Sequence, residues 1–331
     1  MALSVLIIGG GAIAGGYDAD RAEGAPLTHA GAFSADPRFR LTAIVEPDEG
    51  RRSAFQDRWG VPAGAASIEA LEASAGQFDV ISICSPTEHH PAHLSAALAL
   101  KPRLIFAEKP VAKSVSEAAG LVARADADDV ALAVNHTRRW DPEVQALAEQ
   151  LRSGAWGAVR AATGFYTKGA VHNGVHMIDL LRLLLGDLQL LWVGAARHDF
   201  WNDDPSPPAA LVSHDGVPVQ LVAGHAGDYA LFELTLTTER GQITMTDGGM
   251  GWMLRPAGDS AHFPGYQALA RGELRPGGYP HAMTNAVDNI ARAILSGDDL
   301  ACTGHDALKA QALCEQIRDR ALTAPADGPV S

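Results

Sequence analysis

The feature that most constrains the fold of this chain is a short apolar run near its start that breaks into glycines. The run Val5–Ile8 is followed by Gly9-Gly10-Gly11-Ala12-Ile13-Ala14. This pattern predicts a strand that turns directly into a helix: Gly9 permits the tight turn, Gly11 lets the backbone approach a pyrophosphate, and Ala14 lets helix and strand pack closely. The amides at the helix start would attract phosphates. A turn that serves packing alone stays open as the alternative. The predicted dinucleotide-binding residues here are Gly9, Gly11, Ala12, Ile13 and Ala14.

Length and composition predict a two-domain protein of ordinary globular type. The chain has 331 residues, and 39 acidic against 26 basic side chains give a net charge of −13. This balance argues against binding to nucleic acid or to an anionic membrane. The cysteines (Cys84, Cys302 and Cys314) are few and widely spaced, which is typical of reduced thiols. With neither a basic leader nor an unbroken apolar span, we expect a soluble cytoplasmic protein.

Residues 1–135 alternate short apolar runs with helical patterns, which is typical of βαβ units. We predict a Rossmann-like, doubly wound parallel sheet that binds NAD or NADP. Between its first two strands, the insertion 15–26 folds over a cofactor, forms a subunit contact, or is a disordered loop. The predicted strands are 4–8, 41–45, 80–84, 104–107 and 131–134. The predicted helices are 12–20, 28–35, 48–58, 67–74, 88–99 and 114–125.

The pattern of residues 136–331 predicts a second, α+β domain that binds the substrate and mediates oligomerisation. After residue 152, strand patterns follow one another without intervening helices, which favours a largely antiparallel open sheet. The Gly- and Pro-rich stretch 255–280 is expected to be a loop, and we expect the tail after Ala324 to fray. The predicted strands are 159–167, 188–198, 209–213, 217–223, 231–238 and 242–247. The predicted helices are 174–185, 281–296 and 305–322.

Glu46 follows the second predicted strand, where a dinucleotide fold places an acid on the adenosine ribose. A carboxylate there accepts hydrogen bonds from both ribose hydroxyls and repels a 2′-phosphate, so NAD is favoured. Arg51 and Arg52 keep NADP open. The alternative is that Glu46 only precedes a helix as an entry acid.

Three further polar segments each follow the end of a predicted strand, where open α/β sheets bind ligands. They are Ser85-Pro86-Thr87-Glu88-His89-His90, Glu108-Lys109-Pro110 and Asn135-His136-Thr137-Arg138-Arg139-Trp140-Asp141-Pro142. Two later segments are Gly154-Ala155-Trp156-Gly157 and His172-Asn173-Gly174-Val175-His176-Met177-Ile178-Asp179. In this order the set resembles the Gfo/Idh/MocA family of glucose–fructose oxidoreductase and inositol dehydrogenase. The resemblance spans roughly residues 3–186.

The resemblance implies an enzyme that moves a hydride to or from a hydroxyl-bearing carbon of a sugar, sugar nucleotide or inositol-like ring. It implies that Lys109 polarises the reacting oxygen and that His176 is the acid/base. An imidazole, with an ordinary pKa of about 6.5, can take the hydroxyl proton at neutral pH, and an ammonium stabilises alkoxide charge. It also implies a homodimer or homotetramer formed through the second-domain sheet. The cofactor-binding residues it implies are Ser85, Thr87, His90, Glu108, Lys109 and Asn135.

One position departs from the family pattern. Many members carry an aspartate four residues before the acid/base histidine, whereas this chain has His172. Either His172 contacts the substrate, or proton transfer is arranged differently, or the reaction is not plain polyol oxidation. Asp179 either substitutes in part for the missing carboxylate, or caps the helix or pairs with Arg182.

Basic side chains near these segments predict contacts with an anionic group of the substrate. Lys168, with Arg138 and Arg139, would supply positive charge for a phosphate or carboxylate. The alternatives are that Lys168 protects an edge strand and that an arginine pairs with Asp141. The predicted substrate-binding residues are Lys109, Arg139, Lys168, His172, Asn173 and His176.

Histidines at helical spacing raise the question of a metal. His172 and His176 lack the glutamate of an HExxH motif and an evident third ligand, and the group His89, His90 and His93 is more typical of solvated or capping side chains. We therefore expect no metal site.

Two other functions stay open. A nucleotide-binding regulatory protein without catalysis would explain the missing aspartate, although the intact Lys109, Asn135, Arg139 and His176 argue against it. An enzyme that uses NAD transiently, for elimination or epimerisation, would hold its coenzyme tightly and release no NADH. The absorbance of the reduced nicotinamide band, before and after sugars are added, distinguishes these functions.

Overall fold

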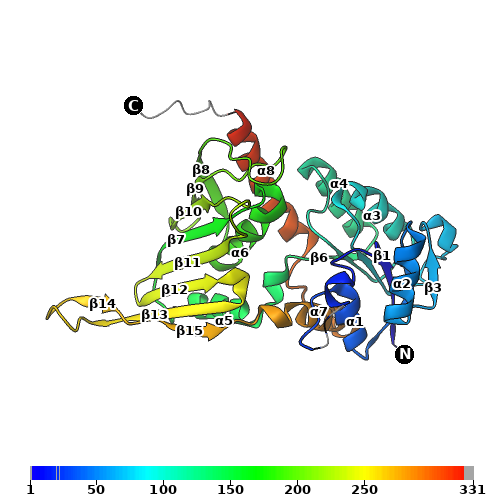
Figure 1. The fold of residues 1–331 in the computed structure, drawn as a ribbon, viewed down its shortest axis with the longest axis horizontal. Helices are drawn as coiled ribbons and strands as arrows, with labels where there is room; N and C mark the ends of the chain where they lie inside the picture. Colours follow the sequence, from blue (N-terminus) through cyan, green and yellow to red (C-terminus); the bar gives the residue numbers. More distant parts are fainter. Residues whose placement is uncertain (1, 20, 22, 324–331) are drawn as a thin grey trace. The chain divides into compact units, whose positions relative to one another are not determined.

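The computed structural model describes residues 2–19, 21 and 23–323. The chain forms two compact units (Figure 1). Unit 1 consists of Met1–Asp141 and Pro280–Lys309, and unit 2 of Pro142–Tyr279 and Ala310–Ser331. The domain boundary predicted after residue 135 differs from this division, because a later segment of the chain returns to pack with unit 1. The tail after Ala324 lies outside the described residues.

Unit 1 is built on a six-stranded parallel sheet with the order β3-β2-β1-β4-β5-β6, so the predicted Rossmann-like fold is confirmed. Strands of such a sheet are covered on both faces and form nearly continuous apolar runs, which is why the sequence located all of them except the short edge strand β3. The order reverses between β1 and β4. The strands are β1 Leu3–Ile8, β2 Phe39–Val45, β3 Ala63–Ala65, β4 Val80–Ile83, β5 Leu104–Ala107 and β6 Ala131–Val134.

Helices cover the two faces of this sheet with separate clusters of apolar side chains. Phe33 and Val287 belong to the cluster that contains Phe106, whereas Leu94 and Leu121 belong to the cluster that contains Ile105. Successive side chains of a strand point to opposite faces, so the adjacent residues Ile105 and Phe106 pack in different clusters. The helices are α1 His29–Ala35, α2 Glu49–Trp59, α3 His90–Ala99, α4 Val115–Ala127 and α7 Ala282–Ser296.

The continuous helix predicted over 12–20 is wrong. A first helical turn follows the glycines and leads only into the short 3-10 helix η1 Gly16–Asp18. The helix then resumes at α1, because the amides of His29 and Ala30 donate to the carbonyls of Ile13 and Ala14 at 3.2 and 2.8 Å. The insertion is therefore looped out of what is otherwise one helix.

Asp18 fixes the described part of this insertion. The buried carboxylate accepts hydrogen bonds from the amides of Leu27 and Thr28 at 3.0 and 2.9 Å. Arg58 on α2 donates to the Asp18 carbonyl at 2.8 Å. These bonds hold both ends of the loop against unit 1, so the described residues of the insertion do not form the disordered loop that the sequence left open.

Unit 2 contains a nine-stranded mixed sheet with the order β14-β13-β12-β11-β7-β10-β9-β8, and β15 also pairs with β13. The pairing of β7 with β10 is parallel and the other pairings are antiparallel, which confirms the largely antiparallel sheet. The first seven strands are β7 Val159–Tyr166, β8 Leu188–Val193, β9 Ala209–Ser213, β10 Pro218–Ala223, β11 Phe232–Thr238, β12 Gly241–Thr246 and β13 Gly251–Asp259. The remaining elements are β14 Gln267–Leu269, β15 Glu273–Pro276, α5 Pro142–Arg152, α6 Val175–Leu185 and α8 Gly304–Thr323.

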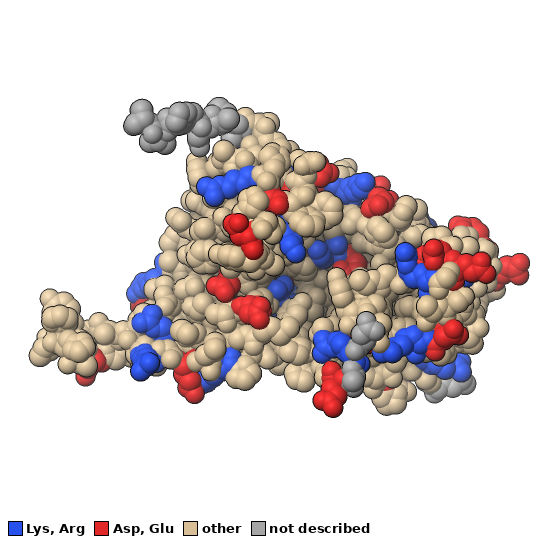
Figure 2. Space-filling model, in the orientation of Figure 1, with Lys and Arg blue, Asp and Glu red and all other residues tan. Residues whose placement is uncertain are grey.

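The loop predicted over 255–280 is wrong, because β13 continues into it and β14 and β15 lie within it. Both added strands are exposed along their length, so they lack the apolar alternation that marks a strand against a core. The tip of the β13–β14 hairpin, residues 260–266, contains no Lys, Arg, Asp or Glu, and it is the tan lobe at the far left of Figure 2.

Smaller departures concern short elements and ends. The helix predicted over 67–74 is only the 3-10 helix η2 Glu69–Leu71, and α5 was not predicted. The strand predicted over 188–198 ends at Val193. Among the described helices, none combines the length and the hydropathy needed to cross a bilayer.

Candidate functional site

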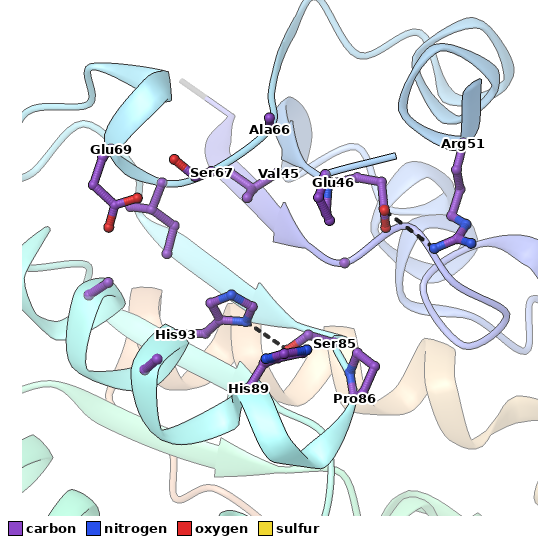
Figure 3. A pocket seen from close by; sticks show the side chains of 15 residues that line it. Val45, Glu46, Arg51, Ala66, Ser67, Glu69, Ser85, Pro86, His89 and His93 are labelled. Carbon is purple, nitrogen blue, oxygen red and sulfur yellow. Dashed lines mark hydrogen bonds and ion pairs between the residues drawn. The ribbon is translucent and has the colours of Figure 1, made fainter. Parts of the chain in front are cut away.

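A pocket of about 490 Å³ lies where β1, β2 and β4 end, at the reversal of strand order (Figure 3). This is the place at which open α/β sheets bind ligands. The pocket brings together three of the predicted cofactor-binding residues, one from the end of each strand. Its lining includes Gly9, Glu46, Arg51, Ser67, Glu69, Ser85, His89 and His93.

The glycine segment forms one wall of this pocket by a close approach of two backbones. Gly9 has a φ of +91°, and an added Cβ would lie 2.8 Å from the backbone nitrogen of Ser85. An added Cβ on Gly11 would instead meet no atom within 4 Å. Gly9 is thus required by the fold, while Gly11 leaves open space beside the first helical turn. That space suits a pyrophosphate against backbone amides, so these residues fit a dinucleotide.

Glu46 is buried at the end of β2, with its carboxylate held beside the glycines. Its Oε2 accepts a hydrogen bond from the Gly10 amide at 2.8 Å, and its Oε1 accepts one from the Asp48 amide at 3.0 Å. Arg51 pairs with the same carboxylate at 3.3 Å (Figure 3), and Arg52 donates to the Glu46 carbonyl at 2.7 Å. Arg51 and Arg52, the arginines for which the sequence left NADP binding as an alternative, therefore both bind Glu46.

His93 on α3 and His89 just before this helix form the opposite wall. Ser85 Oγ lies 2.8 Å from Nδ1 of His93 (Figure 3), and burial together with neighbouring His89 lowers the pKa of His93. His90 is buried and does not line the pocket. Its Nδ1 and Nε2 lie 2.7 and 2.8 Å from the carbonyls of Pro110 and Ser85, so it ties together the segments that follow β4 and β5.

Thr87, predicted to bind the cofactor, lies on the 3-10 helix η3 Thr87–His89 that precedes α3.

Over the ranges that the structure describes, no group of three His, Cys, Asp or Glu side chains is placed to hold a metal ion.

Next to Lys109, a buried cluster joins residues that the sequence did not connect. Nε2 of His29 on α1 lies 3.0 Å from Oε1 of Glu108, and its Nδ1 lies 2.7 Å from Oγ of Ser82. Asn135 donates to the same Glu108 oxygen at 2.7 Å. His29 was not predicted as a site residue. Its one signal is a polar residue among the small and apolar side chains of α1.

Glu108 and His29 form an ion pair. Burial alone would raise the pKa of Glu108, but the hydrogen bond and charge of His29 and the bond from Asn135 lower it. Burial alone would likewise lower the pKa of His29, but Cys84 and Glu108 raise it to about 10. At neutral pH a carboxylate and an imidazolium thus hold each other, with the His29 side chain fully buried and the Glu108 side chain partly buried.

Lys109 and Arg139 complete the predicted residues of unit 1. Lys109 follows Glu108 directly after β5 and is half-buried. Arg139 is buried, and its Nη1 lies 3.2 Å from the Ala301 carbonyl and 3.4 Å from a carboxylate oxygen of Asp306. Its guanidinium therefore ties the segment after β6 to the start of α8.

The other predicted residues lie in unit 2, where β7 leads into the π-helical turn η5 Ala170–Gly174 and then α6. Lys168 has a φ of +66°, and its Nζ lies 5.5 Å from the ring centre of Phe200. Asn173 donates to the Thr167 carbonyl at 2.8 Å. His176 is half-buried in the first turn of α6.

His172 has a carboxylate partner that comes from elsewhere in the chain. Its Nδ1 lies 2.8 Å from Oδ2 of Asp204, and its ring stacks on Trp201 at 4.5 Å between centres. Asp204 was not predicted, and its only sequence signal is an acidic pair before prolines in the stretch 203–208. His172 thus has a carboxylate partner within unit 2, on the loop that precedes β9.

Comparison with known proteins shows which family unit 1 resembles. Residues 3–136 match the sequence model of a family described as "Oxidoreductase family, NAD-binding Rossmann fold". Over this part of the chain, the protein is similar to the Gfo/Idh/MocA family. The match covers the whole parallel sheet of unit 1, which contains the pocket and the buried ion pair.

Individual relatives extend the comparison. A D-apiose dehydrogenase of Rhizobium rhizogenes is 30% identical over 174 residues, which are 47% of this chain and about half (50%) of that protein. An inositol 2-dehydrogenase of Rhizobium meliloti is 24% identical over 87% of this chain and 91% of its own length. A 3-ketoreductase from Actinomadura kijaniata, solved with NADP and TDP-benzene, shares the fold with a TM-score of 0.75 and 21% identity, covering 96% of this chain and 98% of that one.

The His29–Glu108 pair predicts how stability depends on pH. A group whose pKa is higher in the folded state contributes stability that is complete below its unfolded pKa, about 6.5 for histidine, and is lost as pH rises through the folded value. We expect the wild-type unfolding free energy to fall between pH 6.5 and about 10, by up to about 1.4 kcal/mol per pH unit. His29→Gln should remove this slope. Urea unfolding midpoints from pH 6 to about 10 measure it.

The exposed His214 provides the control, since His214→Gln should leave the slope unchanged. Parallel pH profiles for wild type and His29→Gln would contradict the ion pair.

Proposed function

We propose that this protein is an NAD(H)-dependent oxidoreductase that acts on a hydroxyl-bearing carbon of a sugar, sugar nucleotide or inositol-like ring. The observation that carries the proposal is the pocket at the reversal of strand order, which Gly9 and the buried Glu46 line. The open space beside Gly11 lies two residues further along the same segment. The names of the relatives, apiose and inositol dehydrogenases, support a polyhydroxylated substrate.

In this proposal the glycine segment and Glu46 hold the adenosine half of the coenzyme. The amides beside Gly11 bind the pyrophosphate, and Glu46 accepts hydrogen bonds from the ribose hydroxyls. Its negative charge disfavours a 2′-phosphate, while its bonds to Gly10 and Asp48 fix its position. The bound nicotinamide supplies or receives the hydride.

The chemistry at the substrate oxygen falls to two side chains in this proposal. Lys109 donates to the reacting oxygen and stabilises its developing negative charge. His176 takes the hydroxyl proton during oxidation and returns it during reduction. The engagement of Glu108 by His29 and Asn135 supports this role, because it fixes the backbone from which Lys109 projects.

The coenzyme assignment predicts a preference that binding measures directly. We expect NADH to bind at least about tenfold tighter than NADPH, because a 2′-phosphate would face the Glu46 carboxylate. Glu46→Gln keeps an amide oxygen that accepts from the Gly10 amide but removes the negative charge. It should therefore reduce the ratio of the affinity for NADH to the affinity for NADPH. Fluorescence titration of both reduced coenzymes measures this. Glu49→Gln, an exposed change three residues on, should leave the ratio as in wild type. A wild-type preference for NADPH would overturn the assignment.

The proposed role of Lys109 predicts that its replacement lowers turnover but leaves coenzyme binding almost unchanged. Lys109→Met should lower kcat by about 100-fold or more, since it removes the donor to a developing oxyanion. The affinity for NADH should stay within about threefold, because the adenosine pocket does not include residue 109. Lys113→Met, at an exposed lysine in the same segment, should be active. Activity of Lys109→Met within a few-fold of wild type would show that another group polarises the oxygen. The assay is NADH formation with a panel of sugars and inositols.

We also propose that unit 2 mediates homo-oligomerisation. Helix side chains cover one face of its sheet, whereas outward residues such as Thr163, Thr235 and Thr244 lie on the opposite face. Phe263 and Tyr266 are 66% and 71% exposed on the hairpin tip. Light scattering should give the mass of a dimer or tetramer. The double variant Phe263→Ser, Tyr266→Ser should weaken the association of the subunits. A monomer at micromolar concentration would refute this arrangement.

A further inference from the structure

The coenzyme pocket of unit 1 offers little fixed positive charge to a diphosphate. Apart from histidines, the charged side chains among the described residues that line it are Glu46, Glu69 and Arg51. Arg51 already pairs with Glu46 at 3.3 Å, and Glu69 is exposed on the other side of the pocket (Figure 3). Two carboxylates and one guanidinium leave this lining with a net negative charge, which opposes the entry of an anion. The amides of the glycine segment supply only partial charges.

Two histidines line the same pocket and lie beside each other (Figure 3). His89 ends η3 and is exposed, and His93 is half-buried one turn later on α3. Their ring centres are 5.9 Å apart, and Nδ1 of His93 lies 2.8 Å from Oγ of Ser85. Ser85 is also the residue whose backbone lies against Gly9. The histidine pair therefore faces the same space as the glycine turn, where a dinucleotide fold places the diphosphate.

The surroundings of His93 favour its neutral form before a ligand binds. Burial lowers the pKa of His93, His89 and His90 lower it further, and Glu69 opposes them. His90 does not line the pocket, and both of its ring nitrogens lie against backbone carbonyls. Hydrogen bonds from its own amide and from Ser67, with the charge of His93, lower the pKa of Glu69. Carboxylates ordinarily titrate near pH 4, so between about pH 6 and 8 the lining histidines are the groups whose charge can change.

We propose that His89 and His93 form a proton-linked subsite for the diphosphate of the coenzyme. When a dinucleotide binds, this pair takes up a proton from solvent, and the imidazolium donates an N–H hydrogen bond to a phosphate oxygen. An anion beside an imidazole favours the charged form, so the ligand reverses the effect of burial and of the neighbouring histidines. The inference rests on the proposed function and adds to it a dependence of coenzyme affinity on pH.

The pH dependence of binding tests this subsite without turnover. The probes are NADH, followed by its fluorescence, and ADP-ribose, which carries the same diphosphate without nicotinamide. The diphosphate stays ionised between about pH 6 and 8, so a change in affinity over this range reports groups of the protein. A rise of one unit in a histidine pKa on binding corresponds to a roughly tenfold change in Kd. We therefore expect Kd for both probes to increase about tenfold from pH 6 to pH 8. A Kd that is constant, or that falls as pH rises, would overturn the proposal.

The double variant His89→Gln, His93→Asn removes both proton acceptors and keeps polar side chains. The introduced asparagine amide takes the place of Nδ1 and can still bond to Ser85. Its Kd for NADH should be independent of pH, within about threefold of wild type at pH 8 and about tenfold weaker at pH 6. The matched control His305→Gln, at an exposed histidine of the same unit, should keep the wild-type pH dependence. A double variant with the wild-type pH profile would show that other groups take up the proton and would overturn the assignment.

A second measurement needs only the wild-type protein. Calorimetry of NADH binding near neutral pH, in buffers with different ionisation enthalpies, gives the number of protons taken up per coenzyme bound. We expect an uptake of about half a proton or more. No uptake, or a release of protons, would refute the proposal.

The proposed function fails separately. A protein that binds NADH with this pH dependence but converts no coenzyme with any sugar or inositol would retain the subsite and lose the proposed chemistry. Absence of NADH binding at every pH would overturn both.

Discussion

The pocket of unit 1 depends on one backbone contact, that between Gly9 and Ser85. The turn after β1 crosses the segment after β4 so closely that any Cβ at Gly9 would lie 2.8 Å from a backbone nitrogen. Backbone cannot give way as a flexible side chain can, so this residue must lack a side chain and adopt its φ of +91°. The crossing brings the glycine amides beside the end of β2, and the bond from Gly10 to Glu46 follows from it.

A second constraint acts at the end of β5, where charge is buried. A carboxylate in the interior is costly unless it is paired and hydrogen-bonded. Glu108 meets this condition through His29 and Asn135, which come from α1 and from the end of β6. Because α1 continues the first turn after the glycines, the same helix that leaves the coenzyme pocket also supplies the cation for Glu108. These hydrogen bonds therefore connect the glycine turn of the pocket, through α1, to the segment that carries Lys109.

The sequence predicted well those parts of the molecule whose signal is local. Buried parallel strands are unbroken apolar runs, and ligand-side residues follow directly after them, so Gly9, Glu46 and Ser85 could be placed in one site. The exposed strands β14 and β15 have no such pattern. The partners of His29 and His172 lie 79 and 32 residues away, and no spacing rule connects pairs at such distances. Side-chain pairing of this kind is a property of the folded chain.

The loop that precedes β9 builds the turn after β7 through one buried carboxylate. Asp204 accepts hydrogen bonds from the backbone amides of Val171 and His172, and its Oδ2 lies 2.8 Å from Nδ1 of His172. A buried carboxylate is costly unless donors satisfy its oxygens, and this turn supplies them. A single side chain from a distant part of the sequence therefore fixes both the backbone of the turn and the orientation of the His172 ring.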